Sequence, residues 1–170
     1  MNKKLILGYS ITFGVLSGLG CFLFFIAMYY TQPNPLNFRR PDIGINIILI
    51  WAAIWYYKRY NSGYLHFYEG FSIGFLTNLI ASLISGILVY LFIEVVDNTP
   101  FITWIAEAKL FLTKERDLMK TILDDANFKR QLVSLDNSKP YQIILDELMF
   151  KQISIIPISL ISMTMRKINK

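Results

Sequence analysis

The chain has 170 residues, of which 54% are hydrophobic, 15% aromatic and only 17% charged, and its formal net charge is +5. Soluble domains carry roughly 25% charged residues; here long apolar runs alternate with charged stretches, which excludes a disordered or low-complexity chain and favours an integral membrane protein. Seven of the 17 basic residues flank those runs, so the positive charge indicates threading through a bilayer rather than a nucleic-acid surface.

The first apolar run, residues 5–30, predicts a membrane-spanning helix. As a helix it would be about 39 Å long, enough to cross a hydrocarbon core of about 30 Å with tilt. The Gly-Leu-Gly-Cys motif that ends at Cys21 resembles a lipoprotein cleavage site, but residues 22–30 stay apolar. We therefore interpret the run as a retained anchor helix rather than a processed signal.

Residues 31–42 contain three prolines and predict a loop, because proline cannot continue the first helix. A second span is expected at residues 43–57. It would be only about 22 Å long, which is short unless its aromatic end occupies the headgroup zone. The turn residues Asn61-Ser62-Gly63 follow, so the second and third spans should be antiparallel neighbours.

The third expected span, residues 69–96, carries small or polar residues every four positions, which places them on one helix face. The first span has a matching stripe of small residues. Small residues let helix backbones approach closely in lipid. We interpret the two stripes as faces that pack against each other; the alternatives are a dimer interface or a substrate path. The expected helix-packing residues are Ser10, Gly14, Gly18, Gly70, Gly74, Asn78, Ser82 and Gly86.

Residues 97–147 form an exported, water-exposed helical segment in this interpretation. Residues 97–150 hold nine of the 12 acidic residues. Helical spacing predicts a single amphipathic helix over residues 100–126, with Thr99 as its N-cap and Pro100 in its first turn. Its apolar face would contact the rest of the chain, the membrane surface or a partner protein. That face comprises Phe101, Trp104, Ile105, Ala108, Phe111 and Leu112, and continues through Leu118, Met119 and Ile122.

The fourth expected span, residues 148–165, is interrupted by Lys151 near one end and by Pro157 near its middle. Lys151 is expected to extend its ammonium to the membrane interface, and neighbouring serines to satisfy the carbonyl that Pro157 frees. The alternative is a re-entrant or interfacial segment.

The distribution of basic residues predicts the orientation of the chain. With the N-terminus inside, the seven flanking basic residues all lie on the cytoplasmic side, whereas the first outside loop holds only Arg39 and Arg40 with Asp42. Long exported segments are largely exempt from this rule. We therefore expect both termini in the cytoplasm and residues 97–147 on the outside.

The arrangement of these features resembles a known family. A glycine-rich first helix, a short second helix ending in aromatic-aromatic-Lys-Arg, a long exported segment and a last helix closed by Arg-Lys are joined by a characteristic link. The link reads Tyr64-Leu65-His66-Phe67-Tyr68-Glu69-Gly70-Phe71-Ser72-Ile73-Gly74. The chain resembles the bacterial membrane family catalogued as domain of unknown function 4199. The resemblance implies an all-α, polytopic protein with four transmembrane helices and carries no catalytic or ligand residues.

The sequence offers little chemistry. His66 and Glu69 stand three apart, but two groups are too few for a dedicated metal site, so we expect a structural histidine. The adjacent carboxylates Asp146 and Glu147 diverge by about 100° on a helix and are expected on a solvated face. Glu94 is the one acid inside an apolar run and is interpreted as a polar cap or a functional carboxylate. We expect no metal, no cofactor and no catalytic residue.

Three functions remain open from sequence. The first is a non-catalytic accessory or interaction subunit of the bacterial inner membrane, whose partners are membrane lipids and either another membrane protein or a second copy of the chain. The second is a small transporter with Asn78, Ser82 and Glu94 lining a polar path. The third, a membrane enzyme, lacks a visible polar cluster. Nucleic acid is not an expected partner.

Overall fold

The computed structural model describes residues 3–114 and 124–167, and this part of the chain is helical, with no strand beyond an isolated bridge between Leu65 and Lys167. The elements in chain order are α1 (Lys3–Thr31), α2 (Pro35–Phe38), the 3₁₀ helix η1 (Arg40–Asp42), α3 (Ile43–Tyr60), α4 (Phe67–Val95), α5 (Thr99–Lys114), α7 (Asp125–Asp136), α8 (Gln142–Lys151), the 3₁₀ helix η2 (Gln152–Ser154) and α9 (Ile155–Thr164). The expected all-α class is confirmed for these residues.

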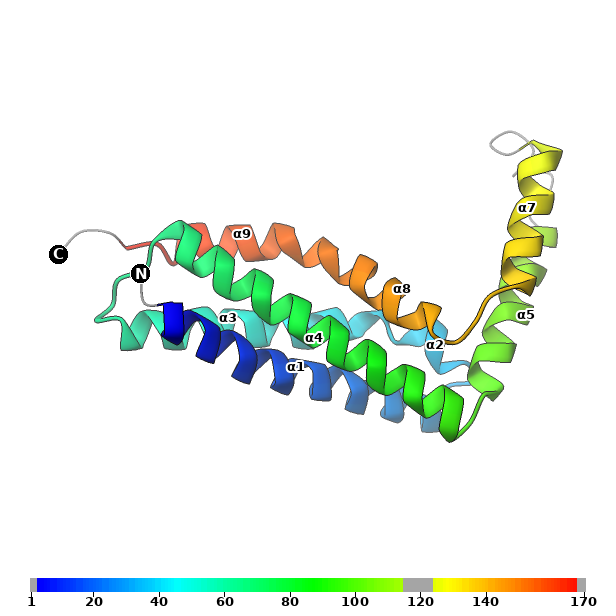
Figure 1. Cartoon of the computed structure of the whole chain (residues 1–170), viewed down its shortest axis with the longest axis horizontal. Coiled ribbons are helices and arrows are strands. Elements are labelled where there is room, and N and C mark those ends of the chain that lie inside the picture. The colour runs from blue at the N-terminus through cyan, green and yellow to red at the C-terminus, as the bar shows by residue number, and fades with distance from the viewer. Residues whose placement is uncertain (1–2, 115–123, 168–170) are drawn as a thin grey trace.

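Four helical rods lie side by side in a bundle (Figure 1). They are α1, α3, α4 and a last rod in which α8, η2 and α9 follow one another, and α4 contacts each of the other three. The start of α1 and the end of α9 lie at one end of the bundle, which we call the termini end. Helices α5 and α7 lie at the opposite end, the arm end, and project sideways from it.

Two of the four expected spans are helices long and apolar enough to cross a membrane. Residues 5–30 lie in α1 and residues 69–96 largely in α4, and each helix has 29 residues, a length of about 43 Å. The expected spans at residues 43–57 and 148–165 fall on α3, which has 18 residues, and on the α8–η2–α9 rod.

The connection between the first two rods is helical rather than the expected loop. Pro35 is the first residue of α2, and the Asn34 side chain caps that helix by accepting the Leu36 N–H at 3.2 Å. Proline suits this position because the first helical N–H groups have no partner within the helix. The second connection is confirmed as a tight turn, since Ser62 and Gly63 have φ of 55° and 83°.

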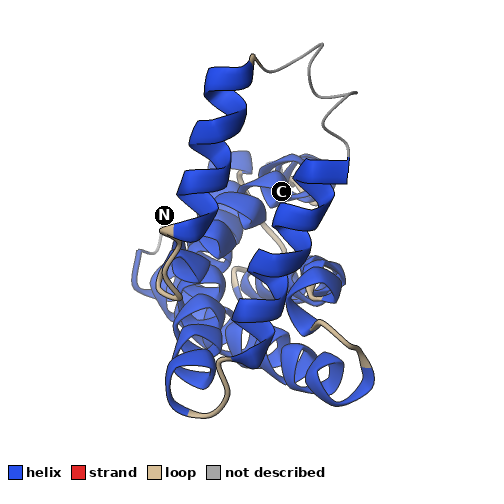
Figure 2. Cartoon of the chain, turned by 90° about the vertical axis from the view of Figure 1, so that its right-hand side faces the viewer, coloured by secondary structure: helices blue, strands red, loops and turns tan. Residues whose placement is uncertain are grey.

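The arm, defined as α5 and α7, corrects the prediction of one helix over residues 100–126. Helix α7 begins at Asp125, where the Asp124 carboxylate caps it by accepting the Asn127 N–H at 2.7 Å. The two helices lie side by side across the end of the bundle (Figure 2). Lys109 of α5 forms an ion pair with Asp136 of α7, so the second helix returns alongside the first. Leu118, Met119 and Ile122 lie outside the described residues.

The start of α5 also differs in detail from the prediction. Thr99 is the first residue of the helix, and its N–H donates to the Asp97 carboxylate at 2.9 Å, so Asp97 takes the capping role expected of Thr99. Pro100 lies in the first turn, as predicted. The Tyr29 hydroxyl donates to the same carboxylate at 2.8 Å, which ties the end of α1 to the α4–α5 connection. Hydrogen bonds from Thr99, and then from Tyr29, lower the pKa of Asp97 below its ordinary value.

Apolar side chains form two separate clusters inside the bundle. The termini-end cluster has Ile6, Ile50, Ala53, Ile54, Tyr57, Leu65, Ile73 and Ile158 at its centre. The arm-end cluster contains Phe25, Leu36, Val89, Ile93, Phe101 and Ile143, so it includes the base of the arm. Between the two clusters, each rod has a stretch of residues that belongs to neither. These four stretches carry the polar site described below.

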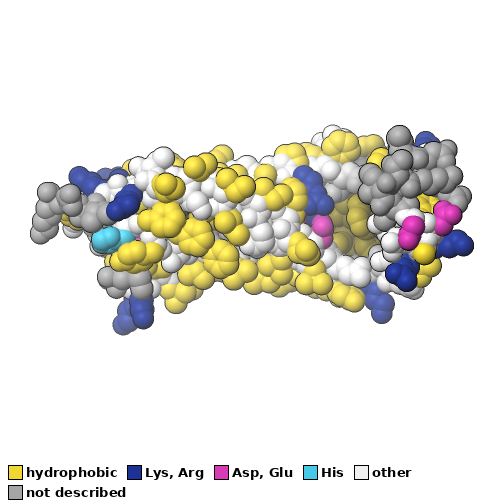
Figure 3. Space-filling view, turned by 90° about the horizontal axis from the view of Figure 1, so that it is seen from above, with side chains coloured by type: hydrophobic (Ala, Val, Ile, Leu, Met, Phe, Trp, Pro, Cys, Tyr) yellow, Lys and Arg dark blue, Asp and Glu magenta, His cyan; other side chains and the backbone are white. Residues whose placement is uncertain are grey.

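The side of the bundle is apolar and its ends are charged (Figure 3). Hydrophobic side chains cover the middle of the face in view, and Lys and Arg side chains gather toward the ends. Large hydrophobic residues are exposed along all four rods, including Leu16 and Leu23 of α1, Ile48 of α3, Ile87 of α4 and Leu160 of α9. Such a belt between charged ends is the surface that a lipid bilayer requires.

Candidate functional site

Buried polar side chains occupy the middle of the bundle, between the two apolar clusters. On α1, Ser17 lies between Ile6 and Phe25; on α4, Asn78 lies between Ile73 and Val89. Asn78 is about 16 Å along the helix from one end of α4 and about 25 Å from the other. All these polar residues are buried, so their hydrogen bonds must be made within the protein.

Lys151 lies at the centre of a charged group. Its side chain is 0% exposed, and its ammonium lies 2.6 Å from Glu147 Oε1 and 3.1 Å from Asp42 Oδ2. It also donates to the Ser85 hydroxyl at 2.9 Å, and Ser85 in turn donates to Glu147 Oε1 at 3.0 Å. The expectation that Lys151 extends to the membrane interface is therefore wrong: two carboxylates hold its ammonium inside the bundle, because an unpaired buried charge is costly.

Glu147 extends this group toward the arm end. Its second oxygen lies 3.0 Å from Arg39 NH1, and Arg39 NH2 lies 2.6 Å from the Asp146 carboxylate. Arg40 lies 3.5 Å from the same Asp146 oxygen. The expectation that Asp146 and Glu147 form a solvated face is wrong for Glu147, which is buried. We call these six residues the charge network: Arg39, Arg40, Asp42, Asp146, Glu147 and Lys151.

A column of neutral polar groups adjoins the charge network. The Ser17 hydroxyl donates to Asn46 Oδ1 at 2.8 Å, and Asn46 donates to Asn78 Oδ1 at 2.5 Å. The Asn78 amide nitrogen donates to the backbone carbonyl of Lys151 at 3.0 Å. This column of Ser17, Asn46 and Asn78 thus links all four rods, one hydrogen bond after another.

The two stripes of small residues do not pack against each other. Gly14 and Gly18 do face α4, but a Cβ added to either would lie 2.7 Å from the Cβ of Ile80 or Ile84, beside the α4 stripe rather than on it. Ser10 donates to the Ile73 carbonyl at 3.4 Å, on this same side of α4. The stripe of α1 therefore contacts the face of α4 that lies next to the α4 stripe.

The α4 stripe instead faces the last rod. A Cβ added to Gly70, Gly74 or Gly86 would approach Ser162, Ile158 or Ile144 at 3.0, 2.7 or 3.1 Å. Asn78 bonds to the Lys151 carbonyl in the same row, and the buried Ser82 hydroxyl donates back to the Asn78 carbonyl at 2.8 Å. The stripe therefore lets the α8–η2–α9 rod, with its two buried charges, lie close against α4.

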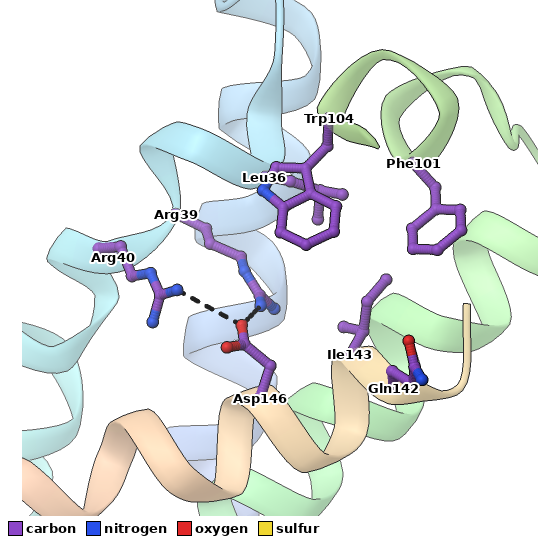
Figure 4. Close-up of a pocket in the computed structure, with 8 residues that line it drawn as sticks. All are labelled: Leu36, Arg39, Arg40, Phe101, Trp104, Gln142, Ile143 and Asp146. Atoms are coloured by element: carbon purple, nitrogen blue, oxygen red, sulfur yellow. Dashed lines mark hydrogen bonds and ion pairs between the residues drawn. The ribbon is translucent and has the colours of Figure 1, made fainter. Parts of the chain in front are cut away.

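A pocket of about 90 Å³ opens beside the charge network at the arm end (Figure 4). Its polar side is formed by the two arginines and Asp146, and its apolar side by residues of α2, α5 and α8. Arg39 is buried, whereas the side chains of Arg40 and Asp146 are 44% and 46% exposed. The residues lining the pocket are Leu36, Arg39, Arg40, Phe101, Trp104, Gln142, Ile143 and Asp146.

The bundle covers only the first part of the predicted apolar face of α5. Phe101 is buried in the arm-end cluster, and Trp104 and Ile105 pack against it. Glu107 fastens the helix one turn further out, accepting hydrogen bonds from Asn34 at 2.7 Å and Asn37 at 2.6 Å. Beyond this point Phe111 is 59% exposed. Ala108 and Leu112 line a shallow groove between α5 and α7.

The remaining candidate residues have structural roles or lie apart. Glu69 accepts the Tyr57 hydroxyl and the His66 N–H, each at 3.0 Å, at the start of α4. Glu94 is exposed in the last turn of α4, away from Asn78 and Ser82. Across residues 3–114 and 124–167, no three His, Cys, Asp or Glu side chains gather where they could hold a metal ion.

The charge network was missed from sequence, although one signal was available. Glu147 and Lys151 stand four apart, with the acid first, which is the favourable order for a helical ion pair. Both residues begin an apolar run, so a shared buried site was a reasonable interpretation. Arg39 and Asp42 carry no such signal, since they reach the site only through the helical turns α2 and η1.

Comparison with known proteins identifies the family but no characterised relative. No curated protein and no solved structure matches the chain. Residues 12–167 match the family described as Protein of unknown function (DUF4199). Since this match covers most of the 170 residues, the chain belongs to that family.

Proposed function

We propose that the protein is a non-catalytic, four-crossing membrane protein that serves as an accessory or interaction subunit of a larger assembly. Two long apolar helices, the belt of exposed hydrophobic residues and the burial of paired charges support the membrane location. In this proposal α3 and the α8–η2–α9 rod are the other two crossings, because they run alongside α1 and α4 in the bundle (Figure 1).

The proposed orientation places both termini in the cytoplasm of a bacterial cell, with the arm outside the inner membrane. Four crossings return the chain to the side on which it began, in agreement with the two termini lying at one end of the bundle. Lys58, Arg59 and Arg166 belong to that end, and basic residues are retained on the cytoplasmic side.

The observation that carries the interaction role is the exposed apolar surface of the arm. Leu110 and Phe111, beyond the part of α5 that the bundle covers, and Val133 on α7 are more than half exposed. The arm is also fixed in place by Glu107 and by the buried Phe101. A rigid platform bearing large apolar side chains is typical of a protein-binding surface.

The test compares Phe111→Glu with Thr113→Glu, a matched control because Thr113 is exposed on the same helix. The size of the membrane complex is measured by native electrophoresis after mild-detergent extraction. We expect Phe111→Glu to release the chain from its complex and Thr113→Glu to leave it bound. Complexes of unchanged size for both variants, with normal membrane insertion, would contradict the interaction role.

A small transporter is the second candidate, favoured by the polar column and the charge network inside the bundle. Asn78 and Ser82 belong to this buried polar region, as a transport path along α4 requires. The experiment measures proton and potassium flux in proteoliposomes with a pH-sensitive dye and a potential-sensitive dye. Flux that disappears in Asn78→Leu but persists in Thr113→Glu supports transport; no flux in the unmodified protein argues against it for these ions.

A further inference from the structure

We propose that the arm-end pocket binds the headgroup of a zwitterionic phospholipid whose phosphate is joined to a primary ammonium, as in phosphatidylethanolamine. This inference rests on the proposed membrane location. The pocket offers groups of both charges within reach of solvent: Arg40 and Asp146 are each nearly half exposed and lie 3.5 Å apart. Guanidinium groups match phosphate oxygens, and a carboxylate accepts hydrogen bonds from an ammonium.

The charge balance of the site selects a zwitterion over an anion. The charge network has three basic and three acidic members, so it is formally neutral. An anionic ligand would be attracted by the two arginines. It would also be repelled by the carboxylates of Asp146 and Glu147, which lie 2.6 and 3.0 Å from Arg39. A ligand with both charges can use Arg40 for its phosphate and Asp146 for its ammonium, and the site stays neutral when it binds.

The apolar wall of the pocket suits the part of a lipid next to its headgroup. Leu36, Phe101 and Ile143 come from three different helices and face the same space as the arginines (Figure 4). The cavity itself is about 90 Å³, below the roughly 300–1,000 Å³ of pockets that enclose a whole small molecule, so we expect it to take the polar headgroup while the acyl chains stay outside.

The position of the pocket fits the same ligand. It lies at the arm end of the bundle, where α5 turns away from the axis and where Tyr29 and Trp104 are found. Tyr and Trp side chains are enriched at the level of lipid headgroups. In the proposed membrane orientation the pocket is therefore at the depth of the lipid headgroups. Residues of α2, α5 and α8 form its apolar wall.

The experiment uses the full chain, purified in detergent and stripped of lipid. Its Tm is measured with phosphatidylethanolamine, phosphatidylcholine and phosphatidylglycerol of identical acyl chains, and with soluble phosphoethanolamine and inorganic phosphate. Bound lipid is counted by native mass spectrometry. We expect phosphatidylethanolamine to raise the Tm and to be retained about tenfold more than the other two lipids, a preference equivalent to about 1.4 kcal/mol.

Two variants and a control assign that preference to the pocket. Asp146→Asn should abolish the preference over phosphatidylcholine, and Arg40→Gln should weaken retention of all three lipids. Lys109→Gln, which removes an ion pair on the arm surface, should behave like the unmodified chain. The Tm of each lipid-free variant is recorded, so that loss of folding is separated from loss of binding.

Several outcomes would overturn the inference. If phosphatidylcholine is retained as strongly as phosphatidylethanolamine, the site does not recognise the primary ammonium. If phosphatidylglycerol is retained as strongly, the site does not select a zwitterionic headgroup. A Tm rise with inorganic phosphate alone assigns the site to a free anion. If the chain is embedded in the membrane with the predicted topology and no lipid has an effect, the lipid site is wrong but the proposed function stands. If the chain can be released from the membrane without detergent, the proposed function is wrong.

Discussion

At the centre of the bundle, Lys151 is a charged residue with no exposed surface and with two carboxylates as neighbours. The gain from pairing buried charges only partly offsets the cost of removing them from water, but loss of a single partner leaves the others uncompensated. The stability of the site therefore depends on every member being present. Glu147 illustrates this, because it is shared by Lys151, Ser85 and Arg39.

We predict that Lys151→Met destabilises the protein by about 3–5 kcal/mol, because Asp42 and Glu147 would remain buried with their shared cation gone. The free energy of unfolding is measured by SDS titration from detergent micelles. The matched control is Lys109→Met on the arm, whose half-exposed ion pair with Asp136 should contribute about 0–1 kcal/mol. Similar losses for the two variants would show that burial of Lys151 is not what makes it important.

A second residue-scale prediction concerns Asn78, which both donates and accepts in the polar column. Asn78→Leu should cost about 1–3 kcal/mol, because the buried Asn46 amide nitrogen would lose its acceptor. The same unfolding measurement applies. In Asn46→Leu/Asn78→Leu the cost should be less than the sum of the two single losses, because the two amides satisfy each other. Additive losses would contradict a direct bond between them.

At this scale the sequence predicts which residues are buried on α4 better than what they contact. Spacing of four identified Asn78 and Ser82 as members of one face, and both are buried. The partners of Asn78 come from α3 and α8 through contacts 32 and 73 positions apart in the chain, whereas the Ser82 hydroxyl donates to a carbonyl of α4 itself. Periodicity within a helix reports one face of that helix and contains no information about which neighbour covers it, so the charge network required the tertiary structure.

At the scale of helices, close approach of α1 to α4 depends on two glycines. Any side chain at Gly14 or Gly18 would meet Ile80 or Ile84 at the Cβ atom itself. The backbone fixes the position of a Cβ atom, so neither isoleucine can move it aside by changing its rotamer. The helices must therefore move apart to admit even a methyl group. Ser17, which lies between the two glycines on α1, would then move away from its partner in the polar column.

We predict that Gly14→Ala/Gly18→Ala destabilises the bundle by about 1–3 kcal/mol through overpacking. Gly8→Ala on the same helix is the control, because nothing lies within 4 Å of its added Cβ. Alanine favours a helix over glycine by about 1 kcal/mol, so Gly8→Ala should be neutral or stabilising. The free energy of unfolding in detergent distinguishes them: equal effects at the two sites would contradict tight contact between α1 and α4.

The limits of the sequence at this scale are clearest in the arm and the first connection. Residues 100–126 have helical spacing throughout, but spacing cannot reveal that α7 has its own cap at Asp124 and returns alongside α5. Prolines at 33, 35 and 41 predicted only where α1 must end. Pro35 then begins α2 and Pro41 lies in the first turn of η1, and these helices bring Arg39 and Asp42 to the buried site.

For the whole molecule, the arrangement of charge agrees with the proposed frame. The arm lies across the bundle axis, and so in the plane of a membrane that the bundle would cross (Figures 1 and 2). Basic residues flank the helices at the termini end, and in the middle of the bundle Lys151 is paired with Glu147 and Asn46 with Asn78. An uncharged belt separates the two ends, which is why a net charge of +5 is compatible with burial in lipid.

This frame predicts that the α3–α4 turn and the arm lie on opposite sides of the membrane. Tyr60→Cys and Thr113→Cys, both at exposed positions, are introduced separately in a Cys21→Ser background, which leaves one cysteine in each chain. A membrane-impermeant maleimide is added to intact spheroplasts and to inverted vesicles. Thr113→Cys should be labelled only in spheroplasts and Tyr60→Cys only in vesicles, because the bundle places these positions on opposite sides and the basic residues place the termini end in the cytoplasm. Labelling of both positions from one side would contradict the four-crossing arrangement, and a reversal of the two patterns would keep the crossings but invert the orientation that the basic residues predict.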